Sequence, residues 1–564
     1  MNEINRRRVL AGLATTILPP LFGCAHKIEP ICPTSPEISD ISSPLTIDAH
    51  AHIFNGRDLQ IKEFISQVVV GHQDSELYQV AVVLGGLLQS LGWHAAPDER
   101  DELQALSEYQ AGLQNCAGED ALQKVASRAF EKGYAIGVAQ LREAKRSLER
   151  APEGATVLGP APGFGDALGA VIDDLPPTFR EYEKRRSDAA IVLGGRPTVH
   201  GYINFVLHHF NYRHVNALDY LRTYSPRSPR KIDLLVASMV DYDYWLAKGA
   251  STPTTLEAQV DLMVRVCEVT QGRVHGFAPY CPFREVMTSS GGSPGAALRL
   301  VQRAVMSEGF LGVKMYPPMG FAPWGNTGLK VWAGKPTLLP AAADPEFGKR
   351  LDEALQRLFD WCIANEVPVM AHTNRSNAPY DDFKDLAGAE YWQLALQKFP
   401  GLDVNFGHFG DTDLEDDDGK GSRTFIGLMS DEPNSGGLRA FADSAYFAGV
   451  LTQPKAVEKV LMSLYADSRK QILADRLMYG TDWTMTLPQQ NVDKYLAQFI
   501  EVMRTVQEQG LVPASSGNNL SDAFFGRNAV RYLGLASGRA NRKRLEDFYD
   551  RRKIAQPDWM KKVI

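Results

Sequence analysis

The amino-acid sequence predicts an α/β protein, a (β/α)₈ TIM barrel with a large, mainly helical insertion between the first and second strands. Two observations support this fold class: apolar, β-branched runs alternate with helical stretches, and there are eight such runs. The runs are residues 45–53, 232–240, 272–279, 310–316, 367–373, 402–408, 445–451 and 477–482. A doubly wound open sheet would show a similar alternation, but it usually has fewer strands, so we favour the barrel.

The stretches between these runs have the periodicity of helices with one buried face. The clearest examples precede the third and fifth strands, at Leu262, Val266 and Val269 and at Leu351, Leu355, Leu358 and Cys362. Because a helix follows most of the strands, each strand is expected to run parallel to the previous one.

One connection breaks this rhythm, because about 180 residues separate the first and second strands, far more than an ordinary βα connection. We expect an insertion over residues 55–230, largely helical because apolar residues recur there at helical spacing. Examples are Leu122, Val125, Ala126 and Ala129. A loop that follows a strand leaves a TIM barrel at its catalytic face, so we expect the insertion to cap the active site. The alternative is a packing or oligomerisation element remote from that site.

The N-terminus predicts export and lipid anchoring. Arg6, Arg7 and Arg8 precede an apolar stretch that is too short to span a bilayer comfortably. This pattern resembles a twin-arginine signal, with a general secretory signal as the alternative. Residues 21–24 resemble a bacterial lipobox, which would place the lipid on Cys24. We therefore expect a lipoprotein on the periplasmic side of a bacterial membrane, attached only through this anchor.

These patterns divide the 564-residue chain into six parts. They are a signal peptide (1–24), a tether (25–44), the first strand (45–54), the insertion (55–230), the rest of the barrel (231–535) and a C-terminal tail (536–564).

Composition favours a small-molecule substrate over a nucleic acid. The net charge is −7 and the pI is about 6.0, so no global positive field would attract phosphate backbones. The six cysteines are scattered, without the paired spacing of a zinc site. Whether the chain forms a homo-oligomer is left open.

The strongest chemical signal lies at the end of the first predicted strand, where His50 and His52 follow Asp48. Residues i and i+2 of a strand point the same way, so both imidazoles are expected to face the barrel mouth and can bind one ion. Neutral imidazole nitrogen is a common ligand of Zn²⁺. Taken alone, however, a His-x-His pair is also compatible with two hydrogen-bonded core residues.

Three further polar residues stand at strand ends, His372 at the fifth, His408 at the sixth and Asp482 at the eighth. With the 369–372, 405–408 and 479–483 motifs and the 525–533 segment, the sequence resembles the amidohydrolase superfamily. The resemblance is strongest to the branch that includes aminocarboxymuconate-type decarboxylases. It covers roughly residues 45–55 and 230–535.

This resemblance implies that His50, His52, His372 and Asp482 bind one divalent metal ion, for which Zn²⁺ is the favoured candidate. Asp482 would also accept a proton from the activated water, and His408 would polarise the substrate or act as an acid. In some superfamily members a carboxylated lysine at the end of the fourth strand bridges two metals. Lys314 occupies that place, but we favour a single metal.

Four residues near the predicted strand ends are candidates for substrate binding: Lys314, Asn374, Arg375 and Arg284. An arginine could hold an anionic group in a bidentate manner, and surface ion pairing is the alternative for both arginines.

We expect a metal-dependent hydrolase that uses activated water on an amide, ester or lactone bond. A non-oxidative decarboxylase or hydratase acting on an unsaturated or aromatic carboxylic acid would use the same ligands. A non-catalytic lipoprotein that binds a solute or a partner is the alternative from another class.

Overall fold

The computed structural model of this chain describes residues 43–64, 96–115, 211–224 and 228–563, together with isolated residues between 67 and 209. The last range has gaps at 291–292, 336–337, 376–377, 411–418, 431–438, 467–469, 488, 490 and 511–518. The predicted signal peptide with Cys24, most of the tether, and the helical positions between Leu122 and Ala129 lie outside the described residues.

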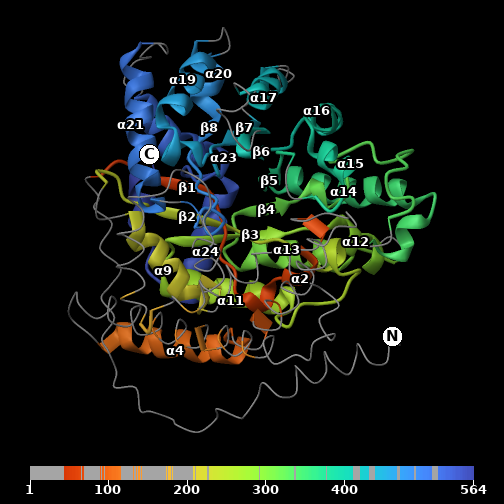
Figure 1. The fold of residues 1–564 in the computed structure, drawn as a ribbon, viewed down its shortest axis with the longest axis horizontal. Helices are drawn as coiled ribbons and strands as arrows, with labels where there is room; N and C mark the ends of the chain where they lie inside the picture. The colour runs from red at the N-terminus through yellow and green to blue at the C-terminus, as the bar shows by residue number, and fades with distance from the viewer. Residues whose placement is uncertain are drawn as a thin grey trace.

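Eight parallel strands form the barrel, and each pairs with the next along the chain (Figure 1). They are β1 (Ile47–Ala51), β2 (Leu234–Ser238), β3 (Val274–Pro279), β4 (Gly312–Met315), β5 (Val369–His372), β6 (Val404–Gly407), β7 (Ala440–Asp443) and β8 (Leu477–Met478). Backbone hydrogen bonds join β1 to the segment after β8, from Ala49 N to Tyr479 O (3.0 Å) and from Asp482 N to His50 O (2.8 Å). The predicted barrel is therefore confirmed.

The predicted seventh strand was wrong. Residues 445–451 follow β7 and lead into a short helix, α18 (Gly449–Thr452). Ala445, Phe447 and Val450 are apolar because this loop is buried, not because it is a strand. The true strand is only four residues long and ends in the buried Asp443, so it lacks a long apolar run. The other seven predicted strands each contain an observed strand.

Helices surround the barrel (Figure 1). The longer ones are α11 (Leu256–Val269), α13 (Ala296–Ser307), α14 (Phe347–Ala364), α16 (Ala389–Lys398), α17 (Lys420–Ser430), α19 (Pro454–Tyr465), α20 (Lys470–Arg476) and α21 (Tyr495–Glu508). The periodic residues predicted before β5 all lie on the buried face of α14. Thr255 begins α11 by accepting a hydrogen bond from Ala258 N.

Shorter elements fill the connections. They are η1 (Gly56–Asp58), α2 (Ile61–Phe64), α10 (Asp243–Leu246), α12 (Pro282–Thr288), η3 (Pro317–Met319), η4 (Pro340–Ala343), α15 (Asp381–Lys384), η5 (Asp385–Ala387), η6 (His408–Gly410), η7 (Val492–Lys494), α22 (Leu520–Asp522), η8 (Ala523–Arg527), α23 (Asn528–Tyr532) and α25 (Trp559–Lys562).

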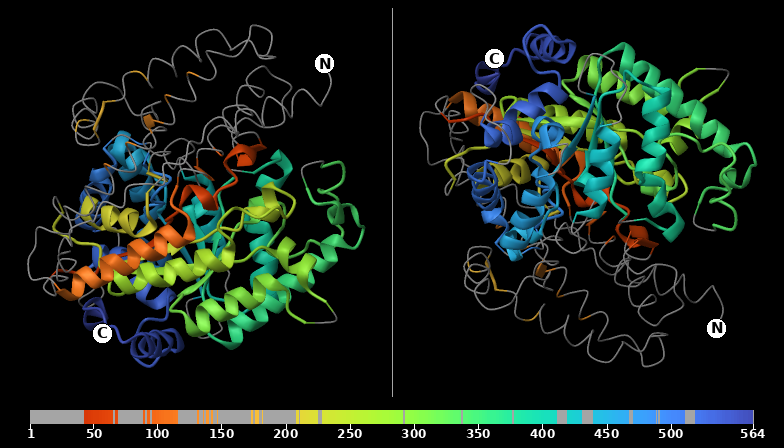
Figure 2. Two further views of the ribbon diagram at one scale, coloured as in Figure 1. Left: turned by 90° about the horizontal axis from the view of Figure 1, so that it is seen from below. Right: turned by 90° about the horizontal axis from the view of Figure 1, so that it is seen from above.

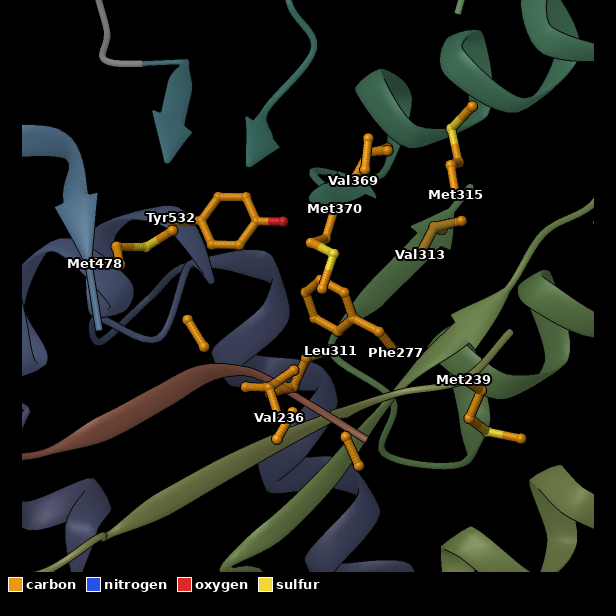
Figure 3. Close-up of a cluster of buried hydrophobic side chains, with 14 of the residues drawn as sticks. Val236, Met239, Phe277, Leu311, Val313, Met315, Val369, Met370, Met478 and Tyr532 are labelled. Atoms are coloured by element: carbon orange, nitrogen blue, oxygen red, sulfur yellow. The ribbon is translucent and has the colours of Figure 1, made fainter. Parts of the chain in front are cut away.

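The barrel interior is packed with apolar side chains, and helix α23 contributes to it (Figure 3). The Tyr532 ring contacts Phe277 of β3 and Phe441 of β7, at centroid distances of 6.3 and 5.4 Å. Strands from different sides of the barrel thus meet on one aromatic ring. Because this packing closes the interior, polar side chains are left to gather at the carboxyl ends of the strands.

The two longest described helices of the predicted insertion are α4 (Glu99–Asn115) and α9 (Arg213–Tyr224), and both pack against α11 on the outside of the barrel (Figures 1 and 2). Arg213, which begins α9, forms buried ion pairs with Asp58 and Glu102. His209 accepts a hydrogen bond from Gly56 N at its carbonyl oxygen (2.7 Å). The described part of the insertion therefore lies beside the barrel, anchored to the loop after β1. The predicted cap over the site stays a prediction.

Helix α24 (Ala540–Arg552) packs the C-terminal tail against α13 and the base of β3. Phe548 and Tyr549 are buried there. His275 Nδ1 donates to Gly309 O, and the Tyr549 hydroxyl donates to His275 Nε2, both at 2.6 Å. The tail is thus part of the packed body. Of the helices described, none has the length and apolar character needed to cross a membrane.

We expect His275 to make stability fall with acid. Burial lowers the pKa of His275 to about 4, whereas the unfolded chain protonates near the ordinary value, so the folded state loses stability as the pH drops below about 6.5. Between about pH 7.5 and about pH 5, the free energy of unfolding measured with urea should fall by about 2 kcal/mol more for wild type than for His275→Gln. Equal pH dependence in the two proteins would show that His275 is not responsible.

Candidate metal centre

The carboxyl ends of β1, β5, β6 and β8 bring together five of the residues that the sequence singled out. They are His50, His52, His372, His408 and Asp482, all of them buried. The Asp482 Oδ1 atom lies 3.2 Å from His52 Nε2 and 3.7 Å from His50 Nε2. Segments separated by more than 400 residues therefore meet at one point. We call these five residues the histidine–aspartate cluster.

Three members of the cluster have ligand atoms that lie within 4.8 Å of one another, namely His50, His408 and Asp482. The other two lie directly beside them. His52 approaches Asp482, and His372 Nδ1 lies 3.0 Å from His408 Nε2. The sequence predicted that His408 acts on the substrate instead of binding the metal. In the structure its ligand atom lies close enough to those of His50 and Asp482 to bind a metal as well.

The imidazoles are oriented by hydrogen bonds behind the cluster. His52 Nδ1 donates to Ser238 O (2.6 Å), and His408 Nδ1 donates to Ala445 O (3.0 Å). His50 Nδ1 donates to the Asp443 carboxylate (3.0 Å). We assign these tautomers from the acceptors, since each acceptor requires a proton on Nδ1. Nε2 then carries a lone pair on all three rings, which is the usual arrangement of histidine metal ligands.

Burial favours the neutral form of His50 and His372. It lowers the pKa of His50 and His372 well below the ordinary value, and the positive charge of Lys314 contributes to both shifts. Burial also lowers the pKa of Lys314 to about 8. Its Nζ lies 3.1 Å from His50 Nε2 and 2.8 Å from Met370 Sδ. Neutral imidazole is the form that binds metal, so the environment suits ligation.

Asp482 provides the test of whether a cation fits. Among the described residues its buried Oδ1 has no hydrogen-bond partner. In the neutral tautomer assigned above, His52 carries its proton on Nδ1 and presents only the lone pair of Nε2 to Asp482. A buried carboxylate that faces lone pairs is unfavourable, and a cation between them removes the cost. The donor set of imidazole nitrogens and one carboxylate therefore fits a divalent metal of the Zn²⁺ type.

Two cluster residues adopt the left-handed backbone conformation, His408 (φ 65°) and Asp482 (φ 55°). This region is uncommon outside glycine, and such strain concentrates at functional sites. In both residues the strained backbone directs the side chain to the cluster.

Sequence reasoning missed Asp443, at the end of β7. Besides His50 Nδ1, its carboxylate accepts from His408 N (3.0 Å), Asn405 Nδ2 (2.7 Å) and Ala445 N (3.1 Å). The misplaced seventh strand hid it. The sequence did carry a signal for it, because Asp443 is a carboxylate that directly follows the apolar residues 440–442. Asp482 was found from the same kind of pattern.

The four predicted substrate-binding residues separate into two pairs. Lys314 lies beside the cluster, in contact with His50, and Asn374 forms a hydrogen bond with His372. The Arg284 guanidinium instead donates to Asp241 (2.6 and 2.9 Å) and to Asp243 (2.6 Å). Arg375 is 70% exposed and pairs with Asp385. The structure thus brings two of the four to the cluster and engages both arginines in ion pairs.

A family model described as "Amidohydrolase" matches residues 249–535, which is just over half of the chain. This chain belongs to the amidohydrolase family. The matched residues include three members of the cluster, His372, His408 and Asp482, and also Asp443 behind it. They exclude His50, His52 and the insertion, which lie before the match. No curated protein matches the chain.

Solved structures of other barrels show a weak likeness. An uncharacterized TIM-barrel protein from Bordetella bronchiseptica is 14% identical, with 63% of this chain and 92% of that chain covered and a TM-score of 0.36. A putative 2-pyrone-4,6-dicarboxylic acid hydrolase from Pseudomonas putida is 15% identical, with 56% and 86% covered and a TM-score of 0.31. A 5-carboxyvanillate decarboxylase from Novosphingobium aromaticivorans is 14% identical, with 63% and 92% covered and a TM-score of 0.31. These values add nothing to the family assignment.

We expect Asp443→Asn to weaken metal binding while the amidohydrolase keeps its fold. The substitution removes the anionic acceptor behind His50, and loss of such a partner typically costs tenfold to about 100-fold in metal affinity. Competition with a chelator measures the affinity. Asp403→Asn is the matched control, because Asp403 is a half-buried carboxylate that pairs with Arg439 before β6. Equal affinities in the two variants would contradict a role for Asp443.

Proposed function

We propose that this amidohydrolase is a metal-dependent hydrolase that cleaves an amide, ester or lactone bond of a small molecule. One observation carries the proposal, namely the buried Asp482 Oδ1, which faces the Nε2 atoms of His50 and His52 and has no hydrogen bond from any residue that the structure describes. A carboxylate in this position is both a ligand and a proton acceptor.

In this proposal His50, His52, His372 and Asp482 hold one divalent cation, with Zn²⁺ favoured by the donor set. When bound, such a cation polarises a carbonyl oxygen and lowers the pKa of a water to about 7. The residues behind the cluster fix where the ligands point. Asp443, Ser238 and Ala445 each hold an imidazole by its Nδ1.

The chain's own groups then divide the proton transfers. Asp482 accepts the proton of the attacking water at its carboxylate. His408 is held by Ala445 O at Nδ1 and presents a lone pair on Nε2 to the cluster, so it can take over the proton that Asp482 has accepted. With that proton on Nε2, His408 would polarise the substrate oxygen or return the proton to the leaving atom. Lys314 is buried beside His50 and can hold a substrate oxygen.

Asp482→Asn should abolish most turnover without unfolding the protein, because the amide cannot accept the proton. We expect kcat to fall by about 10² to 10⁴-fold at saturating Zn²⁺. The assay is a panel of lactones, amides, esters and aromatic acids, with carbon dioxide release scored separately. Unimpaired turnover in the variant would contradict the proposed base. Carbon dioxide as the main product of the wild type would favour decarboxylation over hydrolysis.

His408→Gln separates a ligand from an acid. If His408 acts on the substrate, the variant should keep about one metal ion per chain and lose kcat by about 10²-fold or more. Metal content by mass spectrometry and steady-state kinetics give the two readouts. A variant that loses the metal would assign His408 to the metal instead.

A further inference from the structure

We propose that Tyr220, on insertion helix α9, is a positioning residue for the metal centre, because its hydroxyl donates to the buried Asp48 carboxylate that holds Thr481 beside Asp482. The insertion would then be part of the catalytic apparatus, not an external addition. This inference rests on the proposed function of the histidine–aspartate cluster, and it concerns residues outside the part of the chain that matches the family model.

Asp48 is a completely buried residue of β1, and its carboxylate faces Thr481 in the segment after β8. Its Oδ1 accepts from His50 N (3.1 Å) and Thr481 N (3.2 Å). Its Oδ2 accepts from the hydroxyls of Thr481 and Tyr220, both at 2.5 Å. Each oxygen thus has two donors. The Asp48 carboxylate thus links the backbone amide of His50 to Thr481, the residue that precedes Asp482.

The segment that carries Asp482 needs such support, because β8 ends at Met478, well before the aspartate. Asp482 itself has a left-handed backbone with a φ of 55°. A non-glycine residue stays in this conformation only when its surroundings impose it. Here the backbone amides of Thr481 and Asp482 donate to His50 O, at 3.2 and 2.8 Å, and Asp48 adds the Thr481 side chain to the same anchor.

Tyr220 reaches Asp48 from outside the barrel, because α9 packs on α11 and α21 (Figure 1). Its ring contacts Trp483 in an edge-on arrangement, with the centroids 5.4 Å apart. Trp483 N in turn donates to Thr481 Oγ1 (3.1 Å). The tyrosine therefore supports the residues on both sides of Asp482, one through Asp48 and the other through its ring.

The start of α9 is fixed independently of Tyr220. Arg213 is completely buried between Asp58 and Glu102, and Asn55 Nδ2 also donates to Glu102 (3.1 Å). Removing a single hydroxyl from Tyr220 should therefore leave the helix docked. Its effect should be confined to the hydrogen bond with Asp48.

Tyr224 offers a matched control one turn further along α9. Its ring also contacts Trp483, at 5.9 Å, and it is equally buried. Its hydroxyl, however, has no hydrogen-bond partner in the described part of the chain. Tyr220→Phe and Tyr224→Phe thus delete the same atom from the same helix, and only the first deletion breaks a bond to Asp48.

The test titrates the metal-free full chain with Co²⁺, follows the visible absorption of the bound ion, and measures kcat and KM on the best substrate of the panel. Tyr220→Phe should bind Co²⁺ about tenfold more weakly, with an altered spectrum, as expected for loss of an outer hydrogen bond. Its kcat should fall about tenfold with little change in KM, because Asp482 is displaced and substrate contacts are not. Tyr224→Phe should match wild type in its Co²⁺ affinity, its absorption spectrum and its kinetic constants.

A second pair of variants keeps the inference testable if Tyr220→Phe does not fold. Thr481→Val removes the other hydroxyl donor to Asp48, and Thr481→Ser retains it. The valine variant should reproduce the weaker Co²⁺ binding and altered spectrum, and the serine variant should restore both. Wild-type spectra and affinity in either Tyr220→Phe or Thr481→Val, or an equal loss in Tyr224→Phe, would overturn this inference alone. Wild-type protein that binds no Co²⁺ would overturn the proposed function as well.

Discussion

The structure of this site depends on one buried carboxylate that is surrounded by lone pairs. Asp482 Oδ1 faces His52 Nε2 at 3.2 Å and His50 Nε2 at 3.7 Å, and the acceptors behind the rings place the proton of each neutral imidazole on Nδ1, which leaves a lone pair on Nε2. Such a set of like partners is stable only with a positive charge among them. The surrounding hydrogen bonds of Asp443 and Asp48 hold these atoms together, as the proposed cation site requires.

Parallel strands bring these atoms together with little demand on local sequence. Every strand of the barrel ends at the same face, so ligands can come from β1 and from the segment after β8 although the chain between them is long. Support comes from outside the barrel too. The described helices of the insertion pack on α11, and α9 reaches the strand ends through Tyr220. The barrel thus determines where the cluster lies, and the contacts around the cluster fix the orientation of its side chains.

Much of this organisation could be predicted from residue patterns, because strand ends and metal-binding side chains are local signals. Seven strands and the meeting of His50, His52, His372, His408 and Asp482 follow from them. The seventh strand did not, since β7 is short and ends in a charged residue. Asp443 was missed with it. The pairing of Arg284 with Asp241 was equally out of reach, because it depends on two loops that only the folded barrel places side by side.

The aromatic ring of Tyr532 has a consequence for the order of folding. It comes from α23, near the end of the chain, yet it packs between β3 and β7. The interior therefore lacks this aromatic ring until the chain has been synthesised through α23, after all eight strands. Domains of this size commonly pass through incompletely packed intermediates. Here the ring that completes the packing between β3 and β7 follows all eight strands in the chain, so the interior is fully packed only once α23 has docked.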